Sequence, residues 1–228
     1  MVDRVVFVAK DVIEENKKLA MRLKGIYDSC GITALEFLGG PGSGKTTLIE
    51  RLLEYMVKDF KSDEIVYIGG DVATTFDTER ISSFGVHTIQ INTGGTCHLE
   101  VPHIEAAIER LGGIEFLKKR KFLIIENVGN MICPFSFPLG AHARIMVADV
   151  AEGVDKFLKH PLSTLVSDII IINKIDLAEY IGINVNKMIE DAHRINPKAP
   201  VFLASAKTRQ GINDVYNTLI SLSKDLSK

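Results

Sequence analysis

The chain has few cysteines and no long hydrophobic run. Three cysteines among 228 residues argue against the disulfide framework of a small secreted domain and favour a reducing compartment. No apolar run approaches the roughly 20 residues that a membrane-spanning helix needs, and the N-terminus lacks the apolar core of a signal peptide. We therefore expect a cytoplasmic protein that does not partner a membrane.

Charge of one sign is not concentrated in any part of the sequence. The 27 basic and 29 acidic residues give a net charge of −2, and there is no basic block or tail that would attract a nucleic acid. The length suits one α/β domain with a substantial core. Because no repeat, low-complexity stretch or linker divides the chain, we expect a single domain over residues 1–228.

What the chain does contain is a glycine-rich loop at residues 39–46, with the pattern G-x-x-x-x-G-K-T. This spacing lets successive backbone N–H groups surround a phosphate, while Lys45 supplies positive charge and Thr46 a ligand for Mg²⁺. An apolar strand pattern over residues 34–38 precedes the loop, and a helical pattern follows it over 47–53. The predicted nucleoside triphosphate site consists of Gly40, Gly42, Ser43, Gly44, Lys45, Thr46 and Thr47.

Two further motifs indicate guanine as the base. Residues 173–176 have the pattern N-K-x-D at the end of a short apolar run, a weak signal when it stands alone. Asp176 is expected to accept hydrogen bonds from guanine N1 and N2, with Lys174 along the base plane and Asn173 tied to the phosphate loop. A third motif at residues 205–207 follows the next apolar run, so the order of motifs predicts GTP rather than ATP. The predicted base-binding residues are Asn173, Lys174, Asp176, Ser205, Ala206 and Lys207.

Apolar runs that recur along the chain predict seven strands. They cover about residues 33–38, 64–69, 87–91, 121–126, 144–150, 168–172 and 200–204, and helical patterns lie near 45–58, 100–111, 185–194 and 212–223. Near-continuous apolar strands that alternate with helices are typical of a parallel sheet covered on both faces. We therefore predict an α/β fold of the P-loop NTPase class, with a mostly parallel central sheet of about seven strands and helices on both faces.

A leading segment, residues 1–31, is predicted to form an amphipathic helix before the nucleotide fold. Its apolar stripe has one polar interruption and consists of Val12, Asn16, Leu19, Leu23, Ile26 and Cys30. Packing against the core is the favoured use of this stripe, and a surface for a partner helix is the alternative. Cys30 is expected to act as a small buried hydrophobe.

The residues after the fourth predicted strand have the pattern of a nucleotide-sensing switch. Small GTPases carry D-x-x-G at this place, and here Glu126 is followed by Gly129. The glycine N–H is expected to sense the γ-phosphate, and the Glu126 carboxylate to hold the metal through a water. Predicted catalytic residues are Lys45, Asp71, Asp77 and Glu126, and predicted magnesium ligands are Thr46 and Asp71. Which of Asp71 and Asp77 orients water stays open, and the lack of a switch glutamine predicts slow turnover.

Two cysteines and a histidine are candidate metal ligands. Cys97 and His98 are adjacent in a glycine-rich loop, and Cys133 lies a few residues after Gly129. Thiolate and imidazole are preferred by Zn²⁺ and suit Ni²⁺, and three ligands leave a position open to water or to a second subunit. The alternative is that these cysteines only pack in the interior. His103 is kept as a residue that could approach the metal, because it is the histidine nearest in sequence.

With these motifs the chain resembles the GTPases that insert nickel during the maturation of nickel–iron hydrogenases, nearly from end to end. The matching residues lie at 12–16, 20, 22, 39–47, 70–71, 77, 79–81, 92–94, 97–99, 126–130, 133–134, 152–153, 155–156 and 160–161, together with the guanine motifs. In that family the residues matching Cys97, His98 and Cys133 bind nickel or zinc, at or near a dimer interface formed with GTP. The resemblance implies a GTP-hydrolysing nickel metallochaperone that forms a homodimer in the GTP state. Its implied partners are other maturation factors and the hydrogenase large subunit.

Departures from the family pattern restrict what the resemblance implies. No cysteine motif or histidine-rich tail precedes the phosphate loop, so we expect only the metal site linked to the switch. Glu100 stands where the family commonly has aspartate, which changes the geometry if that carboxylate approaches the metal. The sister family for urease typically has a contiguous Cys-Pro-His, whereas Phe135 follows Pro134 here, so hydrogenase is favoured. A regulatory GTP-binding module and a chaperone for another cofactor, such as cobalamin, stay open.

Overall fold

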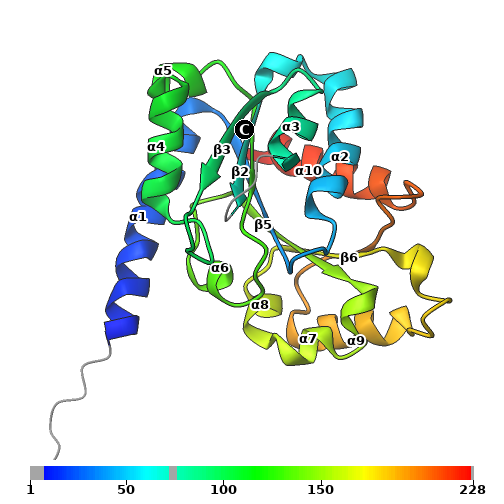
Figure 1. Ribbon diagram of the computed structural model, residues 1–228. Coiled ribbons are helices and arrows are strands. Elements are labelled where there is room, and N and C mark those ends of the chain that lie inside the picture. Colours follow the sequence, from blue (N-terminus) through cyan, green and yellow to red (C-terminus); the bar gives the residue numbers. More distant parts are fainter. Residues whose placement is uncertain (1–7, 72–75, 227–228) are drawn as a thin grey trace, which may run out of the picture.

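Seven parallel strands form one sheet in the computed structural model, which describes residues 8–71 and 76–226. Their order across the sheet is β3-β2-β4-β1-β5-β6-β7 (Figure 1). The strands are β1 (Thr33–Leu38), β2 (Ile65–Asp71), β3 (His87–Asn92), β4 (Phe122–Glu126), β5 (Ala143–Asp149), β6 (Ile169–Asn173) and β7 (Val201–Leu203). Each begins within one residue of the predicted range. The predicted α/β fold is confirmed, and every strand pair is parallel.

Helices cover both faces of this sheet (Figure 1). One face packs against α2 (Lys45–Asp59), α3 (Phe76–Ser82) and α10 (Ile212–Leu226). The other face is covered in two parts. The first part is covered by α1 (Val8–Cys30), α4 (Val101–Leu111) and α5 (Gly113–Leu117). The second part is covered by α7 (Lys156–Lys159) and α9 (Val185–Ile195). The short α8 (Pro161–Leu165) packs against these two helices and against α6 (Cys133–Ser136), which follows the switch segment.

The leading helix packs on the core, as predicted. Leu23 and Cys30 of α1 are buried against α4, α5 and β1. Asn16 is the polar member of the stripe, and its buried amide donates to the carbonyl oxygen of Pro138 at 3.0 Å. Val12, at the beginning of the stripe, is 48% exposed. Residues 1–7 of the predicted segment lie outside the described residues.

Membrane-spanning helices are not found within residues 8–71 and 76–226, because no helix there combines sufficient length with sufficient apolar character.

The carboxyl ends of the strands carry the polar residues that the sequence singled out. The phosphate loop follows β1, while Asp71, Glu126 and Asn173 end β2, β4 and β6. Parallel strands bring these termini to one edge of the sheet, where α/β proteins bind their ligands.

Gly211 before α10 is one position where the backbone requires glycine. Its φ is +72°, and a Cβ at this position would overlap the carbonyl oxygen of Leu203. We expect Gly211→Ala to lower the free energy of unfolding by about 1–2 kcal/mol for the left-handed conformation, plus about 1–3 kcal/mol for the overlap. Gly31, with a φ of +66° and open space around it, is the matched control. Urea denaturation of both alanine variants would contradict this account if Gly31→Ala were the more destabilised.

Candidate nucleotide and metal site

The phosphate loop runs into the first turn of α2. Gly44 has a left-handed conformation with a φ of 88°, and the helix begins at Lys45. The buried Lys45 ammonium donates to the carbonyl oxygens of Gly39 and Gly40, each at 3.2 Å. Burial lowers the pKa of Lys45, and the nearby carboxylate of Glu126 opposes this shift. The loop therefore presents a helix N-terminus and a cation on the same side.

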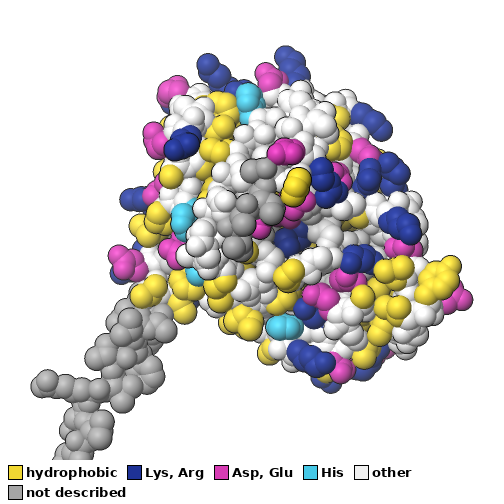
Figure 2. All heavy atoms as spheres, in the orientation of Figure 1, with side chains coloured by type: hydrophobic (Ala, Val, Ile, Leu, Met, Phe, Trp, Pro, Cys, Tyr) yellow, Lys and Arg dark blue, Asp and Glu magenta, His cyan; other side chains and the backbone are white. Residues whose placement is uncertain are grey.

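A cavity of about 540 Å³ lies over this loop. It brings together residues from the ends of β1, β2 and β4, and from α3. The predicted residues that line it are Gly42, Gly44, Lys45, Thr46, Thr47, Asp71, Asp77, Glu126, Gly129 and Lys174. Acidic and basic side chains gather near the centre of the face seen in Figure 2. Such a concave, charged site suits a phosphorylated ligand and its metal ion.

Glu126 is held between two hydroxyl groups. Thr46 Oγ1 donates to Glu126 Oε1, and the hydroxyl of Tyr67 donates to Oε2, both at 2.8 Å. Burial raises the pKa of Glu126, whereas Lys45 lowers it. Thr46, a predicted magnesium ligand, is therefore in direct contact with Glu126, which was predicted to hold the metal through a water. Tyr67 was not predicted, although a tyrosine in a buried apolar strand needs a hydrogen-bond partner.

Both candidate aspartates, Asp71 and Asp77, line the same cavity. Asp77 forms an ion pair with Arg80 at 3.2 Å. Arg80 also binds Glu50 at 2.7 Å and donates to the hydroxyl of Thr47 at 3.2 Å. Arg80 was noted only as a matching residue in the sequence, but it links α3 to the phosphate-loop helix.

The guanine motifs meet the phosphate loop as predicted. Asn173 Nδ2 donates to the carbonyl oxygen of Ser43 at 2.9 Å, and the backbone N–H of Ala206 donates to Asn173 Oδ1 at 3.1 Å. Ser205 Oγ donates to Asp176 Oδ1 at 2.6 Å. A second cavity of about 260 Å³ lies at this junction, lined by Gly44, Thr47, Asn173, Lys174, Asp176, Leu177, Ala206 and Lys207. Ser205 does not line it, and its contact orients Asp176.

Lys174 connects the guanine motif to the rest of the site. Its φ of 60° is unusual for a residue with a side chain. Its ammonium donates to the carbonyl oxygen of Gly42 at 2.7 Å and forms an ion pair with the buried carboxylate of Asp149 at the end of β5. Asp149 was not singled out from the sequence, because its role depends on the neighbouring strand β6.

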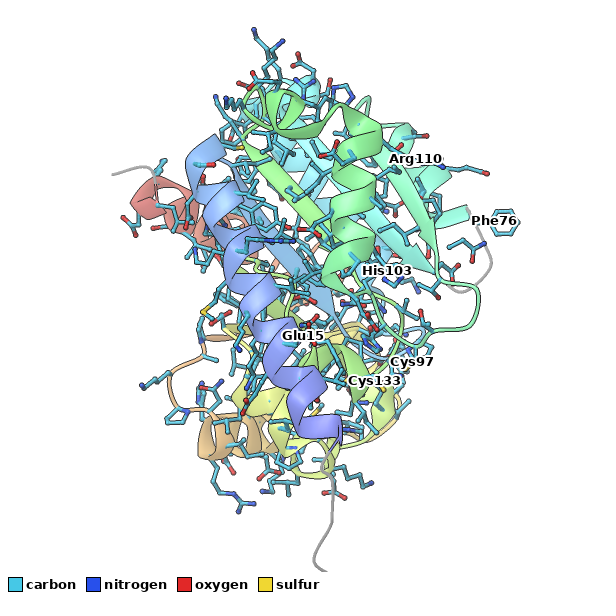
Figure 3. All side chains as sticks on the ribbon, turned by 90° about the vertical axis from the view of Figure 1, so that its left-hand side faces the viewer. Glu15, Phe76, Cys97, His103, Arg110 and Cys133 are labelled. Atoms are coloured by element: carbon cyan, nitrogen blue, oxygen red, sulfur yellow. The ribbon has the colours of Figure 1, made fainter. Side chains whose placement is uncertain are left out.

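The three candidate metal ligands come together. The ligand atoms of Cys97, His98 and Cys133 all lie within 4.8 Å of one another, and Cys97 Sγ is 3.5 Å from His98 Nδ1. Figure 3 shows Cys97 next to Cys133, with His103 on the neighbouring helix α4. His103 Nδ1 accepts the backbone N–H of Glu100 at 3.0 Å, so it caps α4. Within residues 12–71 and 76–226, this is the group of three that could hold a metal ion.

The histidine of this cluster is oriented from two sides. Its ring stacks on Phe137 with centroids 4.3 Å apart. His98 Nε2 is buried and forms no well-aligned hydrogen bond with the described residues, and it lies 3.3 Å from Glu100 Oε1. A carboxylate behind a metal-binding imidazole is a common supporting arrangement. Glu100 therefore faces the histidine ring.

The protonation states of the cluster suit a cation that displaces protons. Burial lowers the pKa of His98, so the neutral imidazole, which is the ligand form, is favoured. A hydrogen bond with Cys97 and burial both raise the pKa of Cys133. Metal binding at these thiols therefore releases protons. Two sulfurs and one imidazole nitrogen fit Zn²⁺ or Ni²⁺ better than a hard cation.

Comparison with known proteins gives a consistent family. Residues 34–203 match the family described as CobW/HypB/UreG, nucleotide-binding domain. The chain is 43% identical to a probable hydrogenase maturation factor HypB of Methanocaldococcus jannaschii, over 97% of each protein. It is 39% identical to the hydrogenase/urease maturation factor HypB of Helicobacter pylori, over 96% of this chain and 88% of that protein.

Solved structures agree with this grouping. The crystal structure of HypB from Helicobacter pylori in complex with nickel superposes with a TM-score of 0.85 at 39% identity, covering 94% of this chain and 97% of that one. HypB from Archaeoglobus fulgidus gives 0.83 at 37% identity, covering 92% and 99%. A signal recognition particle receptor FtsY, with a TM-score of 0.56 at 15% identity, covers 100% of this chain and 76% of that one. It shares the fold alone.

Proposed function

Because the chain belongs to the CobW/HypB/UreG family of nucleotide-binding domains, we propose that it is a GTP-hydrolysing metallochaperone that delivers nickel during the maturation of nickel–iron hydrogenases. The family and the P-loop fold make it a nucleotide-binding protein of the GTPase type. One contact carries the rest of the proposal. An isolated β-bridge joins Gly39 of the phosphate loop to Asn130, three residues before Cys133 of the metal cluster.

Hydrolysis in this proposal is phosphoryl transfer to water. Thr46 and Asp71 would hold magnesium, for which hydroxyl and carboxylate oxygens are suitable ligands, and the bound ion would supply positive charge beside the phosphates. Lys45 leaves the loop carbonyls for the phosphate oxygens. Glu126 positions the Thr46 hydroxyl, and Asp77 is the second carboxylate in the cavity that can orient water. Asp71 and Asp77 both line the cavity over the phosphate loop.

The bound nucleotide affects the metal site through the segment from Gly129 to Cys133. The α-carbon of Gly129 packs so closely on Pro41 of the phosphate loop that an added Cβ would lie 3.0 Å from the Pro41 α-carbon. Cys133 is the fourth residue after Gly129, at most about 14 Å along an extended chain. A γ-phosphate that binds the Gly129 N–H therefore constrains Cys133. By reciprocity, a metal that prefers one nucleotide state changes nucleotide affinity by the same factor.

Assembly completes the proposal. In the GTP state two copies form a homodimer that brings both metal clusters together, and hydrolysis loosens the cluster for transfer. The recipients are other hydrogenase maturation factors and the hydrogenase large subunit in the cytoplasm. The name of the Helicobacter pylori relative includes urease as well as hydrogenase, so delivery to urease is a second candidate. Phe135 after Pro134 favours hydrogenase.

Metal uptake by cysteine variants tests the delivery function. We expect Cys97→Ala with Cys133→Ala to abolish binding of Ni²⁺ and Zn²⁺ at this site, because one imidazole remains of the three ligands. Equilibrium dialysis of both metals, with and without a non-hydrolysable GTP analogue, measures the loss. Cys30→Ala is the matched control, because Cys30 is buried in the α1 interface. Uptake unchanged by the double substitution would leave only a regulatory GTP-binding module.

A further inference from the structure

Glu36 is a buried carboxylate in the middle of a mostly apolar strand. It lies on β1, three residues before Gly39, and its side chain is completely shielded from solvent. Strand alternation places it on the face of Ala34 and Leu38, which belong to the two separate apolar clusters of that face. A buried charge is costly unless each oxygen is paired. Its partners therefore indicate what the carboxylate does.

One oxygen of Glu36 leads to the loop of Cys97 and His98. Asn127 Nδ2 donates to Glu36 Oε1 at 2.8 Å. The other end of the same amide, Asn127 Oδ1, accepts the backbone N–H of Leu99 at 2.9 Å. Leu99 directly follows His98 and is fully buried, so this arm fixes the backbone beside two of the three metal ligands.

The second oxygen leads to the loop of Cys133. Arg144 Nε donates to Glu36 Oε2 at 3.3 Å. The two terminal nitrogens of Arg144 donate to the carbonyl oxygens of Pro134 and Phe135, at 2.9 and 3.2 Å. These carbonyls follow Cys133 directly, so a planar guanidinium holds the start of α6 against β1.

We propose that Glu36 is the positioning residue of the metal centre, a carboxylate that holds the two separate loops of this centre at a fixed distance through Asn127 and Arg144. This inference rests on the proposed metal site. The two loops are far apart in the sequence, since α4, α5 and β4 lie between them. We call Glu36, Asn127 and Arg144 together the hub. The hub also lies at the nucleotide-binding edge of the sheet, because Asn127 follows Glu126, which binds Thr46.

Glu36→Gln tests the hub with little change of shape. Both carboxylate oxygens of Glu36 accept hydrogen bonds, one from Asn127 and one from Arg144. A glutamine has only one side-chain oxygen, so its NH₂ group must face one of these two donors, and that hydrogen bond is lost. We expect Zn²⁺ affinity, measured by competition with a chromogenic chelator, to fall about 10–100-fold. Arg144→Lys keeps a charge beside Glu36 but cannot hold two carbonyls as a fork, and the same loss is expected. Asp191→Asn is the control, because Asp191 is equally buried and pairs with Lys187 on α9.

A metal-free measurement separates positioning from general stability. The sulfurs of Cys97 and Cys133 lie within 4.8 Å, so oxidised glutathione should convert them to an internal disulfide and release two glutathione thiols. We expect this to be several-fold slower in Glu36→Gln and Arg144→Lys than in wild type and Asp191→Asn, at a temperature where all four are folded by circular dichroism. Peptide mass spectrometry identifies the cysteine pair.

The outcomes of these experiments test the positioning role of Glu36 separately from the proposed metal delivery. If wild type binds Zn²⁺ through Cys97 and Cys133 while both hub variants keep wild-type affinity and disulfide rate, the positioning role is wrong and metal delivery stands. If wild type binds no metal but the hub variants slow the disulfide, the loops are positioned as inferred and metal delivery is wrong. Should Glu36→Gln not fold, Arg144→Lys decides between these results.

Discussion

Asp176→Asn is expected to change the nucleotide-binding preference of the protein from GTP to xanthosine triphosphate. The carboxylate can accept from N1–H and N2–H₂ of guanine, and it lines the cavity beside Lys174 and Ala206. An amide presents a donor where guanine also has a donor, whereas xanthine has a carbonyl there. Sites built around such hydrogen bonds discriminate by about 10⁴-fold, so the ratio of the two affinities should change by that order. Competition against a fluorescent nucleotide measures both.

The substitution should leave the fold intact, because Ser205 Oγ can donate to the amide oxygen of asparagine as it now donates to Asp176. Asp214→Asn on the exposed side of α10 is the control, and its GTP affinity should equal that of wild type. Unchanged GTP affinity in Asp176→Asn would place the base elsewhere. A parallel loss of both nucleotides would instead point to a collapsed pocket.

The fold, and the convergence of the segments that form the candidate nucleotide site, are largely predictable from the sequence, because their signals are local. Buried parallel strands have to be apolar along their length, so each is visible as a run. The phosphate loop and the guanine motif are contiguous patterns with a chemical requirement at each position. The short helices α3, α5, α6, α7 and α8 were missed, since such short helices have too few turns to establish a period.

Contacts between neighbouring strands could not be predicted in the same way. Tyr67 binds Glu126 only because β2 lies beside β4, and Asp149 binds Lys174 only because β5 lies beside β6. Glu36 was not singled out, although a carboxylate inside a mostly apolar strand indicates that buried hydrogen-bond partners are needed. The sequence could not name those partners, because Arg144 reaches Glu36 from the adjacent strand β5.

Lys45→Ala is expected to lower the rate of GTP hydrolysis by at least about 10²–10³-fold, the usual cost of removing one electrostatic contact from a transition state. The ammonium is buried at the N-terminus of α2 and lies 3.2 Å from two loop carbonyls. It can therefore move onto a phosphate without refolding the loop. Phosphate release at saturating GTP and magnesium measures the rate. Lys58→Ala in the last turn of the same helix, where the ammonium lies over the Tyr55 ring, is the control.

A second lysine in the same cavity sharpens this test. Lys174 also carries an ammonium near the phosphate loop, but that charge is already paired with Asp149 and the carbonyl of Gly42. We therefore expect Lys174→Ala to weaken nucleotide binding. The rate of GTP hydrolysis by the nucleotide-bound variant should stay within about tenfold of wild type, since loss of the Lys174 ammonium affects the ground state and the transition state equally. If Lys174→Ala lost the chemical rate and Lys45→Ala kept it, the roles of the two lysines would be reversed. The paired ammonium would then be the one that leaves its carboxylate for the phosphate.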